Sequence, residues 1–177
     1  MSEGARPPCR RHHARADGWQ ASFIPARGAP DCGSMEARQV HGSCVSREGN
    51  GVLLLGPPRS GKSDLVLRLL HHGFTLVADD RVDIEDGVAS APSALAGLLE
   101  VRGFGIVRLP CAPSARLVLA LRLGPVSERL PAPEWDVALG VPTACLDPAA
   151  ASAPERVALA LDCLLGRVEQ IAGAFTA

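Results

Sequence analysis

The sequence predicts an α/β domain with a mixed sheet and flanking helices, built around a P-loop that binds a nucleotide phosphate. Three observations support this class. Residues 56–63 read GPPRSGKS and fit the pattern G-x-x-x-x-G-K-[ST]. The apolar run at residues 51–55 before this loop predicts a buried strand, and residues 64–72 after it predict a helix. Strand-like runs separated by turn residues extend to residue 146 and predict the remaining sheet.

The loop supplies the groups that a nucleotide phosphate needs. Backbone N–H groups and the N-terminus of the following helix attract anions. Lys62 can reach the β- and γ-phosphates, and the Ser63 hydroxyl can bind Mg²⁺. Lys62 is the only lysine in the chain, so a chance match to the pattern is rare. The residues expected to bind ATP are Gly56, Pro57, Pro58, Arg59, Ser60, Gly61, Lys62 and Ser63.

Composition argues against several other functions. A net charge of −1 and an aromatic content of 3% give neither a basic surface nor stacking platforms for nucleic acid. No apolar run reaches the roughly 18 residues of a membrane helix. The six cysteines lack CxxC spacing, which predicts reduced thiols rather than a disulfide framework or a metal cluster. We therefore expect a cytoplasmic protein that binds neither nucleic acid nor membranes.

Residues 1–34 differ from the rest of the chain. Arginines, prolines and two adjacent histidines occur there without any periodic apolar pattern. This segment also lacks the apolar core of a secretory signal. It is expected to be either a disordered tail or an artefact of start-site choice, with translation beginning at Met35. The catalytic domain is then expected to span residues 35–177.

The first elements of this domain form a predicted hairpin. Residues 36–45 predict a strand that carries His41 near its middle, and residues 49–51 are typical of a hairpin turn. Antiparallel pairing would place His41 beside the strand that enters the P-loop.

The later elements are predicted in chain order. A helix over 64–72 ends at Gly73, and strands over 75–78 and 82–84 are followed by a turn at 85–87. Next come a short helix over 92–99, a strand-like run over 100–109, a strand over 115–123, a loop over 131–136 and a strand over 143–146. The last element is a helix that begins at a capping box at Ser152 and has an apolar face reaching Ile171.

Asp79 and Asp80 end a hydrophobic strand shortly after the P-loop. A carboxylate in such a place can orient Mg²⁺ or its water, or take a proton from an attacking hydroxyl. Two adjacent carboxylates near a phosphate allow both roles, because like charges raise one of the two pKa values. A turn-forming aspartate pair is the alternative, and the P-loop just upstream favours the catalytic interpretation.

Three further residues are ambiguous by themselves. A lone histidine such as His41 is more often structural, and an acid such as Glu100 is by default an exposed helix-end residue. Glu100 is followed by Arg102 and two glycines within a strand-like run. This context makes Glu100 a candidate metal ligand and Arg102 a candidate phosphate or substrate contact.

Three sequence blocks in this order resemble the HPr kinase/phosphorylase family, the bifunctional serine kinase of the bacterial sugar phosphotransferase system. They are GPPRSGKS at 56–63, LVADDRV at 76–82 and LEVRGFGIVRL at 99–109. His41-Gly42 stands where this family has its active-site histidine. The resemblance implies a P-loop core of the HPr kinase and phosphoenolpyruvate-carboxykinase-like type. It also implies ATP and Mg²⁺ as cofactors, HPr as partner and a homo-hexamer.

The resemblance further implies a role for each candidate residue. Lys62 would bind the transferred phosphate, and Ser63 and Glu100 would hold Mg²⁺. One aspartate of the pair would accept the proton of the target serine and return it during dephosphorylation by inorganic phosphate. We favour Asp79 as this base and Asp80 nearer the metal. His41 would support the site.

The sequence departs from the family in two places. Only an unpatterned segment precedes His41, as in the short alphaproteobacterial form that lacks the N-terminal domain. Residues 141–148 contain no arginine, whereas the family has an arginine-containing segment there. The predicted function is ATP-dependent serine phosphorylation of HPr, with phosphorolysis left open. The alternatives are a catalytically weak ATP-binding regulator and a small-molecule P-loop kinase.

Overall fold

The computed structural model describes residues 37–176, so the predictions for residues 1–34 lie outside the described residues. The elements are β1 (Arg38–His41), β2 (Ser43–Arg47), β3 (Asn50–Leu55), α1 (Lys62–Leu70), β4 (Thr75–Ala78), β5 (Arg81–Glu85), β6 (Val88–Ser90), the 3-10 helix η1 (Ser93–Leu95), β7 (Leu98–Val101), β8 (Gly105–Arg108), β9 (Ser114–Leu123), β10 (Glu134–Asp136), β11 (Val141–Leu146) and α2 (Ala153–Leu164). Within this part of the chain, no helix is both long and apolar enough to cross a bilayer.

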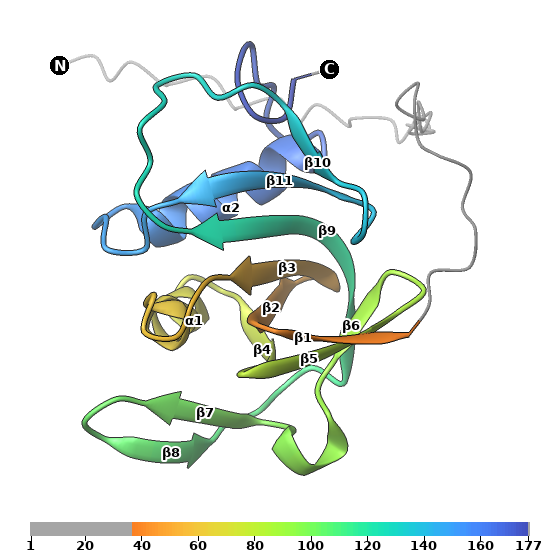
Figure 1. Ribbon diagram of the computed structural model, residues 1–177, viewed down its shortest axis with the longest axis vertical. Helices are drawn as coiled ribbons and strands as arrows, with labels where there is room; N and C mark the ends of the chain where they lie inside the picture. The colour runs from red at the N-terminus through yellow and green to blue at the C-terminus, as the bar shows by residue number, and fades with distance from the viewer. Residues whose placement is uncertain (1–36, 177) are drawn as a thin grey trace, which may run out of the picture. The chain divides into compact units, whose positions relative to one another are not determined.

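The main sheet is mixed, as predicted. Its strands follow the order β1-β5-β6-β9-β3-β2-β4, with β11 also pairing with β9 and β10 pairing with β11 (Figure 1). β3, β9 and β11 are parallel, and the other pairings are antiparallel. β7 and β8 form a separate two-stranded hairpin. The parallel strand β3 is the one that leads into the P-loop.

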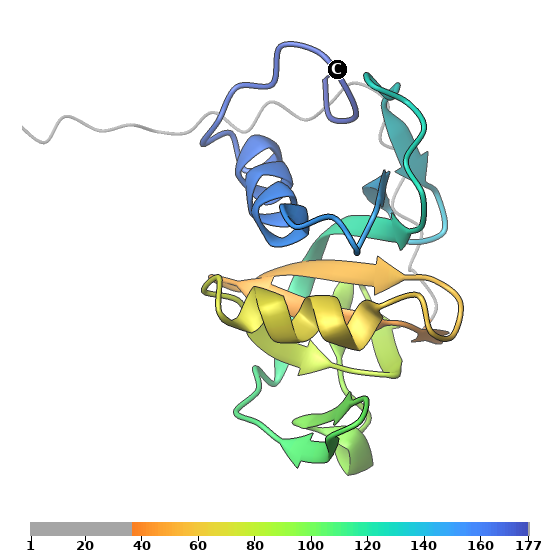
Figure 2. The same cartoon turned by 90° about the vertical axis from the view of Figure 1, so that its left-hand side faces the viewer.

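Two apolar clusters cover the two faces of the sheet. Val52 and Leu54 of β3 pack in one cluster with buried residues of α1 and α2, which both lie on this face (Figure 2). Leu53, between them, belongs to a second cluster with residues of β5, β6 and β9. This alternation is expected because successive side chains of a strand point to opposite faces. The helix that follows the P-loop is thereby fixed against the sheet.

The predicted first strand is in fact two strands, because the chain changes partner at Gly42. β1 pairs with β5, so His41 lies opposite Arg81, whereas β2 pairs with β3. A Cβ atom on Gly42 would lie 2.8 Å from the carbonyl oxygen of Leu54, so a residue with a side chain does not fit at this crossing. The prediction that His41 lies beside the strand entering the P-loop was therefore wrong.

Glycines explain two other corrections. The run over 100–109 is a hairpin rather than one strand, because Gly103, with φ of 75°, lies in the turn between β7 and β8. The predicted hairpin turn at 49–51 forms one residue earlier, at Glu48 and Gly49, which both have positive φ.

The remaining corrections concern the ends of elements. The predicted helix over 92–99 is only η1, and Leu99 lies in β7. The predicted loop over 131–136 contains the edge strand β10. The last helix ends at Leu164, and no side-chain hydrogen bond caps it at Ser152. Ile171, predicted on its apolar face, is 82% exposed.

Candidate active site at the P-loop

The P-loop connects β3 to α1 and holds its lysine in a folded-back position. Gly61 has φ of 86°, a conformation that favours glycine, and it directly precedes the helix. Lys62 is the first residue of α1 and is buried. Its Nζ donates hydrogen bonds to the carbonyl oxygens of Gly56, at 2.8 Å, and Pro57, at 3.1 Å. The ammonium group therefore lies over the loop that is expected to receive phosphate.

Two nearby carboxylates influence the pKa of this lysine. Burial lowers the pKa of Lys62, and the negative charges of Asp79 and Asp80 oppose that shift. The carboxylates thus counteract the loss of positive charge that burial favours. This arrangement places one cation and two anions at one end of the parallel strand β3.

Asp79 is buried and joins three parts of the fold. Its Oδ1 accepts a hydrogen bond from the Ser43 hydroxyl of β2 at 2.6 Å. The Ser63 hydroxyl of α1 lies 3.2 Å from Oδ1 and 3.1 Å from Oδ2. The backbone N–H of Glu100 in β7 donates to Oδ2 at 3.4 Å. The carboxylate is therefore held by β2 and β7 beside the first turn of α1.

Asp80 differs from Asp79 because it lies in a tight turn and is exposed. Its φ is 69°, and the N–H of Arg81 donates to the carbonyl oxygen of Asp79 at 2.9 Å, which is the hydrogen bond of a γ-turn. Such a positive φ is costly for most residues and tolerated best by Asp, Asn and Gly. The turn directs the Asp80 carboxylate to His41, whose Nδ1 lies 3.3 Å from Oδ1.

These groups surround a cavity of about 430 Å³. The predicted site residues that line it are His41, Pro58, Arg59, Gly61, Lys62, Ser63, Asp79, Asp80, Glu100 and Arg102. Gly56, Pro57 and Ser60 of the loop do not line it, although the first two carry the carbonyl groups that bind Lys62. Glu100 and Arg102 belong to the β7–β8 hairpin and are exposed.

Sequence reasoning missed two polar residues at this site, as well as the apolar residues Leu67 and Val101 that also line the cavity. Asp64 lines the cavity from the first turn of α1, and Ser43, which does not line it, donates a hydrogen bond to Asp79. Asp64 follows Lys62-Ser63 directly and could have been included from helix geometry. Ser43 gives no signal in the sequence, because its contact depends on the pairing of β2 with β4, in which Cys44 is opposite Ala78.

The donor groups fit the cofactors that the sequence predicts. The hydroxyl of Ser63 and the carboxylate of Asp79 are hard oxygen ligands of the kind that Mg²⁺ prefers, and Lys62 suits a phosphate. Within residues 37–176, no three His, Cys, Asp or Glu side chains are already gathered as a metal site. A metal would therefore rely on a hydroxyl, water or phosphate oxygens for its remaining ligands, as Mg²⁺ commonly does.

The fold and the loop define the class as a P-loop α/β domain, and comparisons with known proteins specify its type. Residues 34–112 match the family model of the HPr Serine kinase C-terminal domain. An HPr kinase/phosphorylase from Lactobacillus delbrueckii subsp. bulgaricus is 47% identical over 77 residues, which cover 41% of this chain and 24% of that protein. One from Clostridium novyi is 40% identical over 93 residues, covering 50% and 28%.

A solved structure of an HPr kinase is similar to this chain over a longer stretch than the family model matches. The Hpr(Ser) kinase/phosphatase from Coxiella burnetii aligns with a TM-score of 0.62 and 25% identity, covering 73% of this chain and 98% of that one. The predicted resemblance to the HPr kinase family and the predicted fold class are therefore confirmed. The chain spans about a quarter of the length of the curated relatives described above.

Proposed function

We propose that this protein is an ATP-dependent kinase that phosphorylates a serine of HPr or of an HPr-like phosphocarrier protein. The observation that carries the proposal is the buried Asp79, which contacts Ser63 beside Lys62, while a second carboxylate, Asp80, faces the same cavity. The relatives named HPr kinase/phosphorylase support the choice of substrate. A cytoplasmic location and a homo-hexamer remain parts of this proposal, without contacts to nucleic acid or membranes.

The P-loop and its neighbours would hold the nucleotide and the metal. Lys62 and the loop residues would bind the phosphates of ATP, and Ser63, Asp79 and Glu100 would supply oxygen ligands to Mg²⁺. ATP supplies the phosphoryl group, and Mg²⁺ neutralises the charge on its oxygens. Arg102, exposed on the cavity wall, suits a contact to the phosphate or to the protein substrate.

The geometry favours a different division of labour between the aspartates from the one that sequence reasoning suggested. Asp79 is buried and lies at 3.1 Å from the Ser63 hydroxyl, so it is the aspartate nearer the proposed metal site. Asp80 has a side chain that is 64% exposed and is oriented by His41, so a serine from another protein could reach it. We therefore propose Asp80 as the base that would accept the serine proton while the serine oxygen bonds to the γ-phosphorus of ATP and the bond from that phosphorus to ADP breaks, with Asp79 at the metal.

Incubation with Mg²⁺, ATP and HPr from the same organism tests this function. We expect mass spectrometry to find one phosphoserine on HPr, and none on HPr whose target serine is replaced by alanine. Binding of ATP without any phosphorylated HPr would instead support the ATP-binding regulator. Adding excess inorganic phosphate to purified phosphoserine-HPr measures the reverse reaction separately, as release of pyrophosphate.

A further inference from the structure

A buried hydroxyl outside the predicted set touches the centre of this site. Ser43 is the first residue of β2 and has no exposed surface. Its Oγ is 2.6 Å from Asp79 Oδ1, the shortest of the hydrogen bonds to this carboxylate. Because Ser63 also contacts Oδ1, at 3.2 Å, the two serines share one oxygen of Asp79. Ser43 is therefore connected to the P-loop through a single side chain.

The position of Asp79 in the chain explains why it needs such support. β4 ends at Ala78, so Asp79 lies just beyond the last residue that the sheet pairing fixes. The next residue, Asp80, is in the γ-turn, where the chain reverses towards β5. The carboxylate also lies near the charge of Lys62, which attracts it. The hydroxyl of Ser43 is a short-range contact that fixes the orientation of the carboxylate beside Ser63.

We propose that Ser43 is a positioning residue, which orients Asp79 so that Asp79 and Ser63 together receive the Mg²⁺ of the bound nucleotide. Ser43 does not line the cavity and would touch neither substrate. The inference rests on the proposed function for the identity of the ligand. Outer contacts that orient metal ligands commonly change metal affinity by about 10- to 100-fold.

The test compares two variants with the same shape. Ser43→Thr keeps the hydroxyl, Ser43→Val lacks it, and both add similar volume to a buried position. Calorimetry measures binding of ATP as a function of Mg²⁺ concentration and again with EDTA. We expect Ser43→Val to require about tenfold more Mg²⁺ than Ser43→Thr, with equal ATP affinity in EDTA.

Ser46 provides a matched control within the same strand. It is also buried, and it makes no hydrogen bond to the site within residues 37–176. If the added methyl group prevents folding of both β-branched variants, Ser43→Ala is compared with Ser46→Ala. Only Ser43→Ala should then raise the Mg²⁺ requirement, while thermal unfolding shows that both variants are folded.

Two results would overturn the inference. Equal Mg²⁺ requirements for the threonine and valine variants would show that the Ser43 hydroxyl does not orient a metal ligand. An equal loss of ATP affinity with and without Mg²⁺ would show that the hydroxyl supports nucleotide binding independently of the metal. Failure of the kinase proposal is distinguishable from either result. Wild-type protein that binds ATP in a Mg²⁺-dependent manner but never phosphorylates HPr would contradict the kinase, while the comparison at Ser43 would still decide the inference.

Discussion

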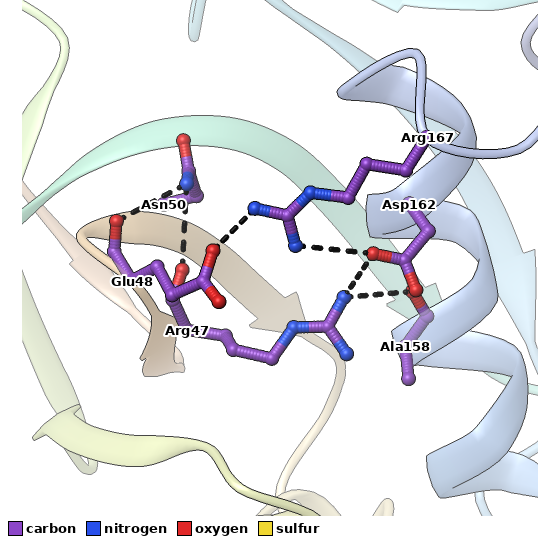
Figure 3. A network of polar contacts seen from close by, with 6 residues as sticks. All are labelled: Arg47, Glu48, Asn50, Ala158, Asp162 and Arg167. Carbon is purple, nitrogen blue, oxygen red and sulfur yellow. Dashed lines mark hydrogen bonds and ion pairs between the residues drawn. The ribbon is translucent and has the colours of Figure 1, made fainter. Parts of the chain in front are cut away.

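The two ends of strand β2 carry polar clusters that differ in how their charges are matched. At its first residue, Ser43 contacts Asp79 beside the P-loop cavity. At its last residue, Arg47 belongs to an ion-pair network between the β2–β3 turn and α2 (Figure 3). Both clusters join β2 to elements distant in sequence, and only the first one opens onto the cavity.

In the network, every charged group has a partner of opposite charge. Asp162 of α2 pairs with Arg47 and, at 3.3 Å, with Arg167, which also pairs with Glu48 (Figure 3). The Arg47 guanidinium further lies 5.3 Å from the ring centre of Phe74. Such matched charges stabilise the contact between the β2–β3 turn and α2, and none of these residues lines the cavity.

At the P-loop, in contrast, the polar groups face a space that a ligand can enter. A buried lysine rests on backbone carbonyl groups, and a pair of carboxylates lies near it. A phosphate that displaced those carbonyl groups would give Lys62 a better partner. The difference shows that the number of charges does not mark a functional site. Groups that a ligand can satisfy better than the protein does are the more useful sign.

The largest effect on the rate of HPr phosphorylation is expected for Lys62→Ala, a substitution at the P-loop. Removing the ammonium group takes away the positive charge at the proposed site of phosphoryl transfer, so the initial rate of HPr phosphorylation should fall by at least about 100-fold. Thermal unfolding should be little changed, because the hydrogen bonds of Lys62 are to loop carbonyl groups and not to another element of the fold. Full activity in this variant would show that the loop has been wrongly assigned.

The next largest effect on the rate is expected at Asp80, and it distinguishes the roles of the two aspartates. Asp80→Asn suits the positive φ at this position and removes the proposed base, so the phosphorylation rate should fall by about 100-fold or more. Its affinity for Mg²⁺ and ATP should stay near that of the wild type. Asp79→Asn should instead raise the Mg²⁺ requirement. The reverse pattern, measured by rate and by Mg²⁺ titration, would restore Asp79 as the base.

A moderate effect on stability alone is expected at the network. Asp162→Asn leaves the half-buried Arg47 without its carboxylate partner, so the free energy of unfolding should fall by about 1–3 kcal/mol. Urea denaturation measures this loss. Arg167→Ala is the comparison variant, and its effect should be smaller because Arg167 is exposed. Equal losses would mean that the exposed pair contributes as much as the inner one.

The smallest effect concerns the cysteines, which belong to neither cluster. Burial raises the pKa of the Cys44 thiol to about 12, whereas Cys145 is exposed on β11. Since the thiolate is the reactive form, iodoacetamide at pH 8 should label Cys145 and leave Cys44 unlabelled in the folded protein. Peptide mass spectrometry after brief labelling measures the extent of alkylation of both cysteines. Rapid labelling of Cys44 in folded protein would contradict its burial.

Local pattern was sufficient to predict the elements around the P-loop. The loop, the strand before it and the strand at Thr75–Ala78 all have strong signals, because each combines an apolar run with glycines or charged residues at its end. The prediction of one strand over 36–45 was wrong because Gly42 is required by a contact with Leu54, which is distant in sequence. No local pattern reports such a contact.

The same limit applies to the site. The sequence identified most of the residues that line the cavity, such as Lys62 and the aspartate pair, because they lie in motifs, but it missed Asp64, Leu67 and Val101. It could not distinguish Asp79 from Asp80, because that difference arises from a γ-turn and from the pairing of β2 with β4. Ser43 was missed for the same reason. The roles of adjacent residues depend on tertiary contacts, and the spacing of motifs in the sequence does not predict such contacts.

One measurement tests the contrast between the ends of β2 most directly. It is the ratio of initial HPr phosphorylation rates for Asp80→Asn and Asp162→Asn, taken well below both unfolding temperatures. Each variant loses one carboxylate charge, but only the first lies at the cavity. We predict that Asp162→Asn stays within about twofold of the wild type, as expected for a distant site, while Asp80→Asn is at least about 100-fold slower. Similar rates for the two variants would contradict the account.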